Sequence, residues 1–302
     1  MTRGLVVMAY GTPSAPEQIE EYYTHIRRGR PPEPQQLEEL VQRYGAIGGI
    51  SPLAERTRAQ MDGIADALEA DDPGGWVVRL GQKHAHPFIE DGVAELVRSG
   101  VDSIVGVVLA PHYSAFSVGQ YNSRADAAAA AATVPYAGIE SWHTEPEFLD
   151  FQAAALRRAL EPMPERTHVL FTAHSLPERV LAGDPYPDQL HDSASEIARR
   201  AGVAQWAGWG LGWQSAGRTP EPWRGPDILE IIRDLADTGR SEGLVAVPQG
   251  FTSDHLEVLY DLDIEARAAA ESVGLAFART DVPNDDPAVM GALARRVRQA
   301  HT

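Results

Sequence analysis

Short apolar runs alternate with longer amphipathic segments along the whole chain, and this alternation is typical of βα units that build a parallel sheet. The short runs are rich in branched and aromatic residues, as buried strands are. They divide evenly between two halves of the chain and cover residues 5–9, 77–80, 104–110, 139–142, 169–173, 206–211, 244–248 and 275–278.

The longer segments carry apolar residues at helical spacing, and many begin at a proline, which is favoured in the first turn of a helix. They predict helices over residues 16–28, 34–44, 53–70, 87–98, 122–132, 146–160, 188–201, 226–238, 254–272 and 287–300.

The two halves resemble each other in how their strands end. The first strand of each half runs into a turn with polar residues and proline, MAYGTP and TAHSLP, and the third ends in LAPHYS or VPQGFTSDH. At 302 residues the chain suits two domains of about 150 residues. We therefore expect an α/β fold of two similar Rossmann-like domains, residues 1–145 and 146–302. Each would hold a four-stranded parallel sheet flanked by helices, and the two would face each other across a cleft.

Open α/β sheets bind ligands outside the carboxyl ends of their strands. Polar side chains gather at these predicted ends and are expected to line the cleft: Tyr10, Lys83, His84, His112, His174 and Glu257. The residues alone leave other interpretations open. Tyr10 is equally suited to a core position, His174 is either a ligand or base or a structural histidine, and KHAHP is read as a polar turn rather than a metal-binding pair.

Three carboxylates follow the strand at 244–248, at Glu257, Asp261 and Glu265. Their spacing puts them on one face of a helix, where like charges four residues apart are mildly destabilising. No Lys or Arg lies between Ser253 and Ala266 to offset that repulsion. The face therefore either fronts solvent or binds a cation.

The formal net charge of −17 argues against a general binder of nucleic acid or of anionic membranes. One basic island, Arg27, Arg28 and Arg30, ends a predicted helix. It either complements the helix dipole or clamps an anion, since guanidinium groups bind carboxylates bidentately. The Gly-rich loop IGGISPL matches no nucleotide-binding fingerprint, so nucleotide binding is rejected.

The motifs MAYGTP, YYTHIRRGR, IGGISPL, FIEDGV, LAPHYSAFSV, AHSLPE, GDPYPDQL, GWQS, GPD and DHLEVLYD occur in this order over nearly the whole chain. Together they resemble the ferrochelatase family, most closely its bacterial coproporphyrin type. The resemblance implies two Rossmann-like domains with a porphyrin cleft between them, and insertion of Fe²⁺ as a substrate into coproporphyrin III to form coproheme in haem biosynthesis.

By this resemblance His174 and Glu257 are the catalytic and Fe²⁺-binding pair, and Tyr10 approaches the porphyrin iron from the opposite face as an axial ligand. Asp261 and Glu265 form an outer divalent site suited to Mg²⁺. The implied substrate-binding residues are Tyr10, Arg27, Arg43, Tyr44, Ser51 and Tyr121. Imidazole suits ferrous iron, and a histidine can equally accept a pyrrole proton near neutral pH. The role of His174 therefore stays open between ligand and base.

The chain has no cysteine, so an iron–sulfur cluster held by thiolates is excluded. No signal segment or apolar run long enough for a membrane anchor is evident, which predicts a cytoplasmic protein. A monomer is the family default, and contacts with the next haem-pathway enzymes would be transient. The lack of an apolar lip favours coproporphyrin, with four propionates, over protoporphyrin IX, with two.

Other functions remain as alternatives. A non-catalytic haem or porphyrin carrier would have no use for the acidic stripe after Glu257. A chelatase for another tetrapyrrole or metal, such as sirohydrochlorin or cobalt, usually lacks the arginine-rich YYTHIRRGR segment. Both features are present here, and a ferrochelatase acting on protoporphyrin IX is the nearest alternative.

Overall fold

The computed structural model describes residues 2–203, 208–217 and 219–301, which form two parallel four-stranded sheets. The first sheet has the order β2-β1-β3-β4 and the second β6-β5-β7-β8, so the two share one topology. Their strands are β1 (Arg3–Ala9), β2 (Trp76–Gln82), β3 (Ser103–Val108), β4 (Tyr136–Gly138), β5 (Thr167–His174), β6 (Trp209–Gln214), β7 (Gly243–Val247) and β8 (Ala276–Arg279). The predicted fold class is confirmed.

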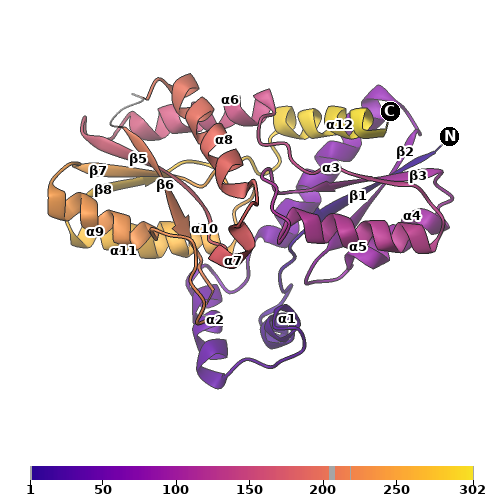
Figure 1. Ribbon diagram of the computed structural model, residues 1–302, viewed down its shortest axis with the longest axis horizontal. Helices are drawn as coiled ribbons and strands as arrows, with labels where there is room; N and C mark the ends of the chain where they lie inside the picture. The colour runs from indigo at the N-terminus through magenta and orange to yellow at the C-terminus, as the bar shows by residue number, and fades with distance from the viewer. Residues whose placement is uncertain (1, 204–207, 218, 302) are drawn as a thin grey trace.

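Helices flank both sheets, and α1 and α2 stand apart from them at one side of the molecule (Figure 1). The α-helices are α1 (Ile19–Ile26), α2 (Pro34–Ala46), α3 (Leu53–Asp71), α4 (Ile89–Arg98), α5 (Val118–Ala131), α6 (Pro146–Leu160), α7 (Glu178–Leu181), α8 (Tyr186–Ala201), α9 (Ile228–Thr238), α10 (Leu256–Leu259), α11 (Arg267–Ser272) and α12 (Pro287–His301). Within the described part of the chain, no helix combines the length and apolar character needed to cross a bilayer.

One hydrophobic core joins the two halves. It contains Leu5 and Val7 of β1, Phe171 of β5 and Met290 of α12 in a single cluster of buried side chains. Helix α12, the last of the chain, packs on α3 of the first half and on α6 of the second. The division into domains at residue 145 stays a prediction, since the core is continuous across it.

Two strands lie at other residues in the structure than the sequence predicts. The fourth strand is Tyr136–Gly138 instead of residues 139–142, and the sixth is Trp209–Gln214 instead of 206–211. Trp206 lies outside the described residues. Ile139 and Trp142 are buried, and their amides bond Gly106 within β3 and Pro111 beyond it, so they carry the apolar signature of a strand although the assigned strand ends at Gly138. In GWGLGWQS, Gly and Trp recur along the whole segment, so its composition fits both the predicted and the observed limits of the strand.

The helix predicted over residues 254–272 is interrupted. Helix α10 is followed by one π-helical turn, η2 (Asp261–Ala266), and then by α11. The amide of Glu265 accordingly bonds the carbonyl of Tyr260, five residues back, at 2.9 Å. Buried Val258, Leu262 and Ala266 recur every four residues, and that spacing suits both an α-helix and a short π segment. The sequence pattern could not distinguish them.

Candidate functional site

Three side chains come together near the carboxyl ends of strands from both sheets, where the sequence predicts the cleft. Tyr10 follows β1, His174 ends β5, and Glu257 lies on α10 after the loop that leaves β7. The His174 Nε2 atom is 3.6 Å from Glu257 Oε1. Glu257 is also close enough to Tyr10 to raise the pKa of its hydroxyl. The parallel topology thus brings together residues that are far apart in the sequence.

The backbone fixes which nitrogen of His174 faces the cleft. Its Nδ1 lies 2.5 Å from the carbonyl oxygen of Ser175. A carbonyl only accepts, so Nδ1 must carry a proton. The neutral imidazole therefore keeps its lone pair on Nε2, the atom that faces Glu257. That one lone pair can bind a metal or accept a proton.

Glu257 is held from several sides. The carbonyl of Glu257 accepts a hydrogen bond from Gln214 Nε2 at 3.0 Å, and His255 Nε2 lies 3.8 Å from Oε2. Burial raises its pKa, but the nearby His174, His255 and Arg43 together lower that pKa to about 2. The side chain remains 30 % exposed to the cleft. Glu257 is accordingly an ionised carboxylate at neutral pH.

Aromatic and imidazole rings pack beside Tyr10. The rings of Tyr10 and His84 have centroids 4.7 Å apart, and His84 Nδ1 lies 3.0 Å from His25 Nδ1. Burial, followed by the nearby Lys83, His25 and Arg124, lowers the pKa of His84 to about 3, so this ring is neutral. Gly11 next to Tyr10 has φ +90°, and a Cβ there would lie 2.8 Å from Ala85. A glycine is therefore required where the Tyr10 turn crosses the KHAHP segment.

Four of the predicted substrate-binding residues already have protein partners. The hydroxyl of Tyr44 lies 3.3 Å from Thr12 Oγ1, and the buried Ser51 accepts from the Leu53 amide at the start of α3. Arg27 donates to the Arg30 carbonyl at 3.3 Å, and Tyr121 is buried beneath Lys83, whose Nζ is 5.1 Å from its ring. Tyr44 and Tyr121 are electrostatically coupled to Tyr10, which places them near the cleft.

Arg43 is turned toward the second half of the molecule. It forms an ion pair with Asp261 at the start of the π-helical turn and lies over the ring of Tyr260 at 4.5 Å. Asp261 also accepts a hydrogen bond from Ser215 Oγ at 2.5 Å. The carboxylate side chain is only 5 % exposed. Arg43 was expected to bind a propionate, but in this structure it joins α2 to η2.

The three carboxylates of the stripe have different surroundings. Glu257 faces the cleft, Asp261 is paired with Arg43, and Glu265 is exposed. Among the residues that the structure describes, no group of three or more His, Asp or Glu side chains is close enough to hold a metal ion. Asp261 and Glu265 as an outer divalent site therefore remain a prediction.

Some site residues were not singled out from the sequence. His255 and Gln214 both hold Glu257, and Ser215 holds Asp261. The signal was present in the motifs DHLE and GWQS, but nothing in their composition separates a supporting residue from a solvated one. His112 was expected to line the cleft, but it lies four residues past the end of β3 and is buried against Ser193, with Nε2 to Oγ 2.8 Å.

Comparison with known proteins gives consistent matches over the full chain. A family model described as ferrochelatase matches residues 2–301. The coproporphyrin III ferrochelatase of Geobacillus kaustophilus is 48 % identical over 300 residues, covering 97 % of this chain and 94 % of that protein. The coproporphyrin III ferrochelatase of Bacillus subtilis is 47 % identical over 298 residues, covering 96 % of this chain and 95 % of that protein.

Solved structures agree on the fold at much lower sequence identity. SirB from Bacillus subtilis with Fe³⁺ superposes with a TM-score of 0.60 at 13 % identity, covering 99 % of this chain and 96 % of that one. CbiX, described as the terminal enzyme for biosynthesis of sirohaem in denitrifying bacteria, gives a TM-score of 0.56 at 16 % identity, with 99 % of both chains covered. These two likenesses support the two-sheet α/β architecture and nothing narrower.

Proposed function

The chain belongs to the ferrochelatase family, and from that membership we propose that it inserts Fe²⁺ into coproporphyrin III to form coproheme in haem biosynthesis. The observation that carries the proposal is the pair of His174 and Glu257, 3.6 Å apart at the ends of β5 and α10. A neutral nitrogen and an ionised carboxylate are suitable donors for a ferrous ion that must be bound only briefly.

Charge balance assigns separate tasks to this pair. Fe²⁺ replaces two pyrrole protons, so two protons must leave the ring as the metal enters. Glu257 is ionised because its pKa lies near 2, and it offsets the charge of the entering ion. The Nε2 lone pair of His174 is the one basic site of that ring, since Nδ1 donates to Ser175. We propose that Nε2 binds the iron first and, once the iron has passed into the ring, accepts one of the two pyrrole protons, while the other is released to solvent water.

Tyr10 is the residue proposed to face the iron from the other side of the ring. Burial, then Glu257 and Tyr44, raise the pKa of its hydroxyl, so Tyr10 is a neutral phenol in the free protein. A phenol is a poor ligand for Fe²⁺, whereas ferric iron favours the phenolate. Tyr10 would therefore ligate the oxidised product rather than assist metal entry.

The choice of coproporphyrin rests on the relatives and on the donors near the cleft. Relatives named for coproporphyrin III match nearly the whole chain. Arg27, Tyr44, Ser51 and Tyr121 are the residues proposed to meet its carboxylates, together with Arg43 when it leaves Asp261. Binding through these groups would exchange present hydrogen bonds for charge-assisted bonds to carboxylates, which are stronger.

Three smaller points concern a second metal ion, an iron–sulfur cluster, and the location and oligomeric state of the protein. An outer Mg²⁺ at Asp261 and Glu265 would place a second cation beside the Arg43 guanidinium, so it would compete with Arg43 for the Asp261 carboxylate. An iron–sulfur cluster is not proposed, since the chain has no cysteine to hold one. We propose that the protein works as a cytoplasmic monomer and meets the next haem-pathway enzymes only transiently.

An anaerobic absorbance assay tests the function. Wild-type protein with Fe²⁺ should convert coproporphyrin III faster than protoporphyrin IX. His174→Ala and Glu257→Gln should each lower the rate by roughly a hundredfold or more, which corresponds to about 2.7 kcal/mol of lost transition-state stabilisation. Coproporphyrin binding, measured by fluorescence quenching, should stay within about tenfold of wild type. His191→Ala, an exposed histidine on α8, is the matched control and should leave the rate unchanged.

The outcomes separate the alternatives. Porphyrin binding without insertion of iron by the wild type would indicate a carrier, and faster conversion of protoporphyrin IX would change the substrate. Near-normal rates in both His174→Ala and Glu257→Gln would reject this pair as the metal-inserting groups.

A further inference from the structure

Glu257 stands on a segment that is not stable by itself. Helix α10 has only four residues, too few to persist alone in water, and it runs directly into the π-helical turn η2, a conformation that is rare in proteins. The buried side chains of Val258 and Leu262 attach one face of this segment to the core. Apolar contacts have no preferred direction, so they do not fix the rotation of the segment. Polar contacts must therefore determine where Glu257 points.

One guanidinium contacts this segment on both sides of Glu257. It belongs to Arg279 at the end of β8, the outer strand of the second sheet, where Arg279 pairs with Ala246 of β7. Its Nε and Nη2 atoms donate to the two carboxylate oxygens of Asp263 in η2, at 2.7 and 2.8 Å. Its Nη1 lies 3.3 Å from Oδ1 of Asp254, which precedes α10. A single side chain thus joins both flanks of the Glu257 segment to the sheet.

Both carboxylates depend on this guanidinium to compensate their charge. Asp254 Oδ1 is buried and accepts no hydrogen bond from any residue that the structure describes. The Arg279 side chain is 15 % exposed. Burial lowers the pKa of its guanidinium, but Asp263, Asp254 and Asp281 raise that pKa above the usual value for arginine. Loss of this cation would leave two partly buried carboxylates that repel each other.

The backbone next to these carboxylates is attached to the rest of the second half. The Asp254 amide donates to Asn284 Oδ1, and Asp254 Oδ2 accepts from Asn284 Nδ2, both at 2.9 Å. Arg267 of α11 donates from Nε to the carbonyl of Asp263 at 3.2 Å. The Arg279 pairs therefore belong to a connected set of polar contacts around the segment, so a change at Arg279 is transmitted to α10.

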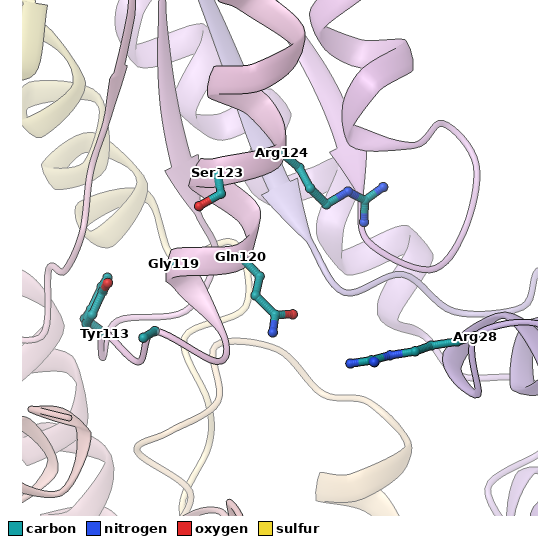
Figure 2. Close-up of a pocket in the computed structure, with 7 residues that line it drawn as sticks. Arg28, Tyr113, Gly119, Gln120, Ser123 and Arg124 are labelled. Carbon is teal, nitrogen blue, oxygen red and sulfur yellow. The ribbon is translucent and has the colours of Figure 1, made fainter. Parts of the chain in front are cut away.

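Arg124 shows how a guanidinium with two bonds to a carboxylate differs when it serves one partner only. It extends from α5 at the wall of a pocket (Figure 2) and donates two hydrogen bonds of 2.7 Å to Glu90. Its side chain is 31 % exposed, and its Nη1 donates to the carbonyl of Lys83 at 3.1 Å. Arg279 is more buried, and its Nη1 faces a second carboxylate. This difference indicates that Arg279 joins two segments, whereas Arg124 pairs with one.

We infer that Arg279 is a positioning residue for the metal-inserting pair: by holding Asp254 and Asp263, it keeps Glu257 at its distance of 3.6 Å from His174. Within the described residues, no hydrogen bond or ion pair joins Arg279 to either member of the pair, so it acts only through the segment that carries Glu257. The inference rests on the proposed function for the reaction that the pair performs. A displacement of about 1 Å at a reacting group can slow a reaction by about a hundredfold.

The test compares Arg279→Met with Arg200→Met. Arg200 is the matched control because it also binds two carboxylates, those of Glu196 and Asp150 at 2.8 and 2.7 Å, and is 22 % exposed, but it joins α8 to α6. Arg279→Met should lower kcat for iron insertion by about tenfold to a hundredfold. Affinity for coproporphyrin III, measured by fluorescence quenching, should change by less than about threefold. Arg200→Met should lower the melting temperature by a similar amount and leave kcat unchanged.

A double variant separates positioning from stability. Arg279→Met combined with Asp263→Asn removes both partners of the main pair, so no unpaired carboxylate remains in η2. This protein should regain part of the melting temperature that Arg279→Met loses, yet keep the low kcat, since its link to β8 is still missing. Recovery of kcat together with the melting temperature would show that Arg279 serves stability alone. An unchanged kcat in Arg279→Met would equally overturn the inference.

The position of Glu257 can be measured without substrate. In a crystal structure of Arg279→Met, the distance from Glu257 Oε1 to His174 Nε2 should exceed the present 3.6 Å. Amide hydrogen exchange over residues 254–266 should be faster than in wild type and in Arg200→Met. An unchanged distance with unchanged exchange would refute the positioning role even if kcat fell. A wild type that inserts no iron would reject the proposed function, while these two readouts would still decide the inference.

Discussion

Breaking the ion pair between Arg43 and Asp261 should destabilise the protein measurably. The Asp261 side chain is 5 % exposed, whereas Arg43 is 29 % exposed and also lies over Tyr260. Asp261→Asn keeps the size of the side chain and the hydrogen bond from Ser215 but removes the charge. A hydrogen bond between charged groups contributes about 1.5–3 kcal/mol, and loss of a fully buried partner costs about 3–5 kcal/mol.

The partial exposure of Arg43 favours the lower part of this range, so we expect a loss of about 2–3 kcal/mol. At roughly 2 °C per kcal/mol for a chain of this size, the melting temperature should fall by about 4–6 °C. Arg43→Met should cost at least as much, because it leaves a buried carboxylate with only Ser215 as its described side-chain partner.

The assay is a double-mutant cycle on melting temperature and on the free energy of unfolding in urea. The double variant should lose less than the sum of the two single variants, with a coupling energy of about 1–3 kcal/mol. Additive losses, or a neutral Asp261→Asn, would refute the pair as a stabilising contact. A second readout is coproporphyrin affinity. If Arg43 also serves the substrate, Asp261→Asn should tighten binding by freeing the guanidinium, while Arg43→Met should weaken it.

Two more predictions concern the cleft. The pKa of Lys83 is about 8 in the folded protein, below the ordinary value of 10.5 for a lysine. Protonation of Lys83 therefore costs folding stability below pH 8, and this cost fades as pH rises from 8 to 10.5. Lys83→Met should accordingly raise stability at pH 7 by about 1 kcal/mol after allowance for solvent screening. The gain should vanish near pH 10.5, and a gain that persists there would contradict the reasoning. Tyr10→Phe should change the absorption spectrum of the bound ferric product more than it changes turnover, and an unchanged spectrum would remove Tyr10 as a ligand.

The sequence predicted the fold well because two signals can be read from short segments of the chain: the spacing of apolar residues, and the polar residues that follow each strand. The central strands β1 and β5 are short, buried and apolar, and the structure has them within two residues of their predicted limits. The misplaced fourth strand shows where this reasoning fails: Ile139 and Trp142 are as buried as strand residues, but only backbone pairing defines a strand.

The candidate site was predictable only in part. His174 and Glu257 stand at strand ends, and that position is visible in the sequence. The partner of Arg43, Asp261, is 218 residues away in the chain and lies at the start of the π-helical turn. No local pattern encodes such a long-range contact. For the same reason His255 could not be distinguished from the ordinary polar residues of a turn.

The shared core constrains how a large flat substrate enters. Phe148, Leu156, Met290 and Phe171 lie in one cluster that spans both sheets. Rotating the halves apart would expose such side chains to water at about 1.5–3 kcal/mol each. Opening the molecule by rotating its two halves apart therefore costs too much free energy to be an ordinary step of turnover. Helices α1 and α2, in contrast, contribute only Ile19 and Tyr44 to the buried residues. Admission of the substrate and release of its metallated form should be governed by displacement of these two helices, so that the rate of turnover depends on the mobility of a peripheral segment while His174 and Glu257 stay fixed.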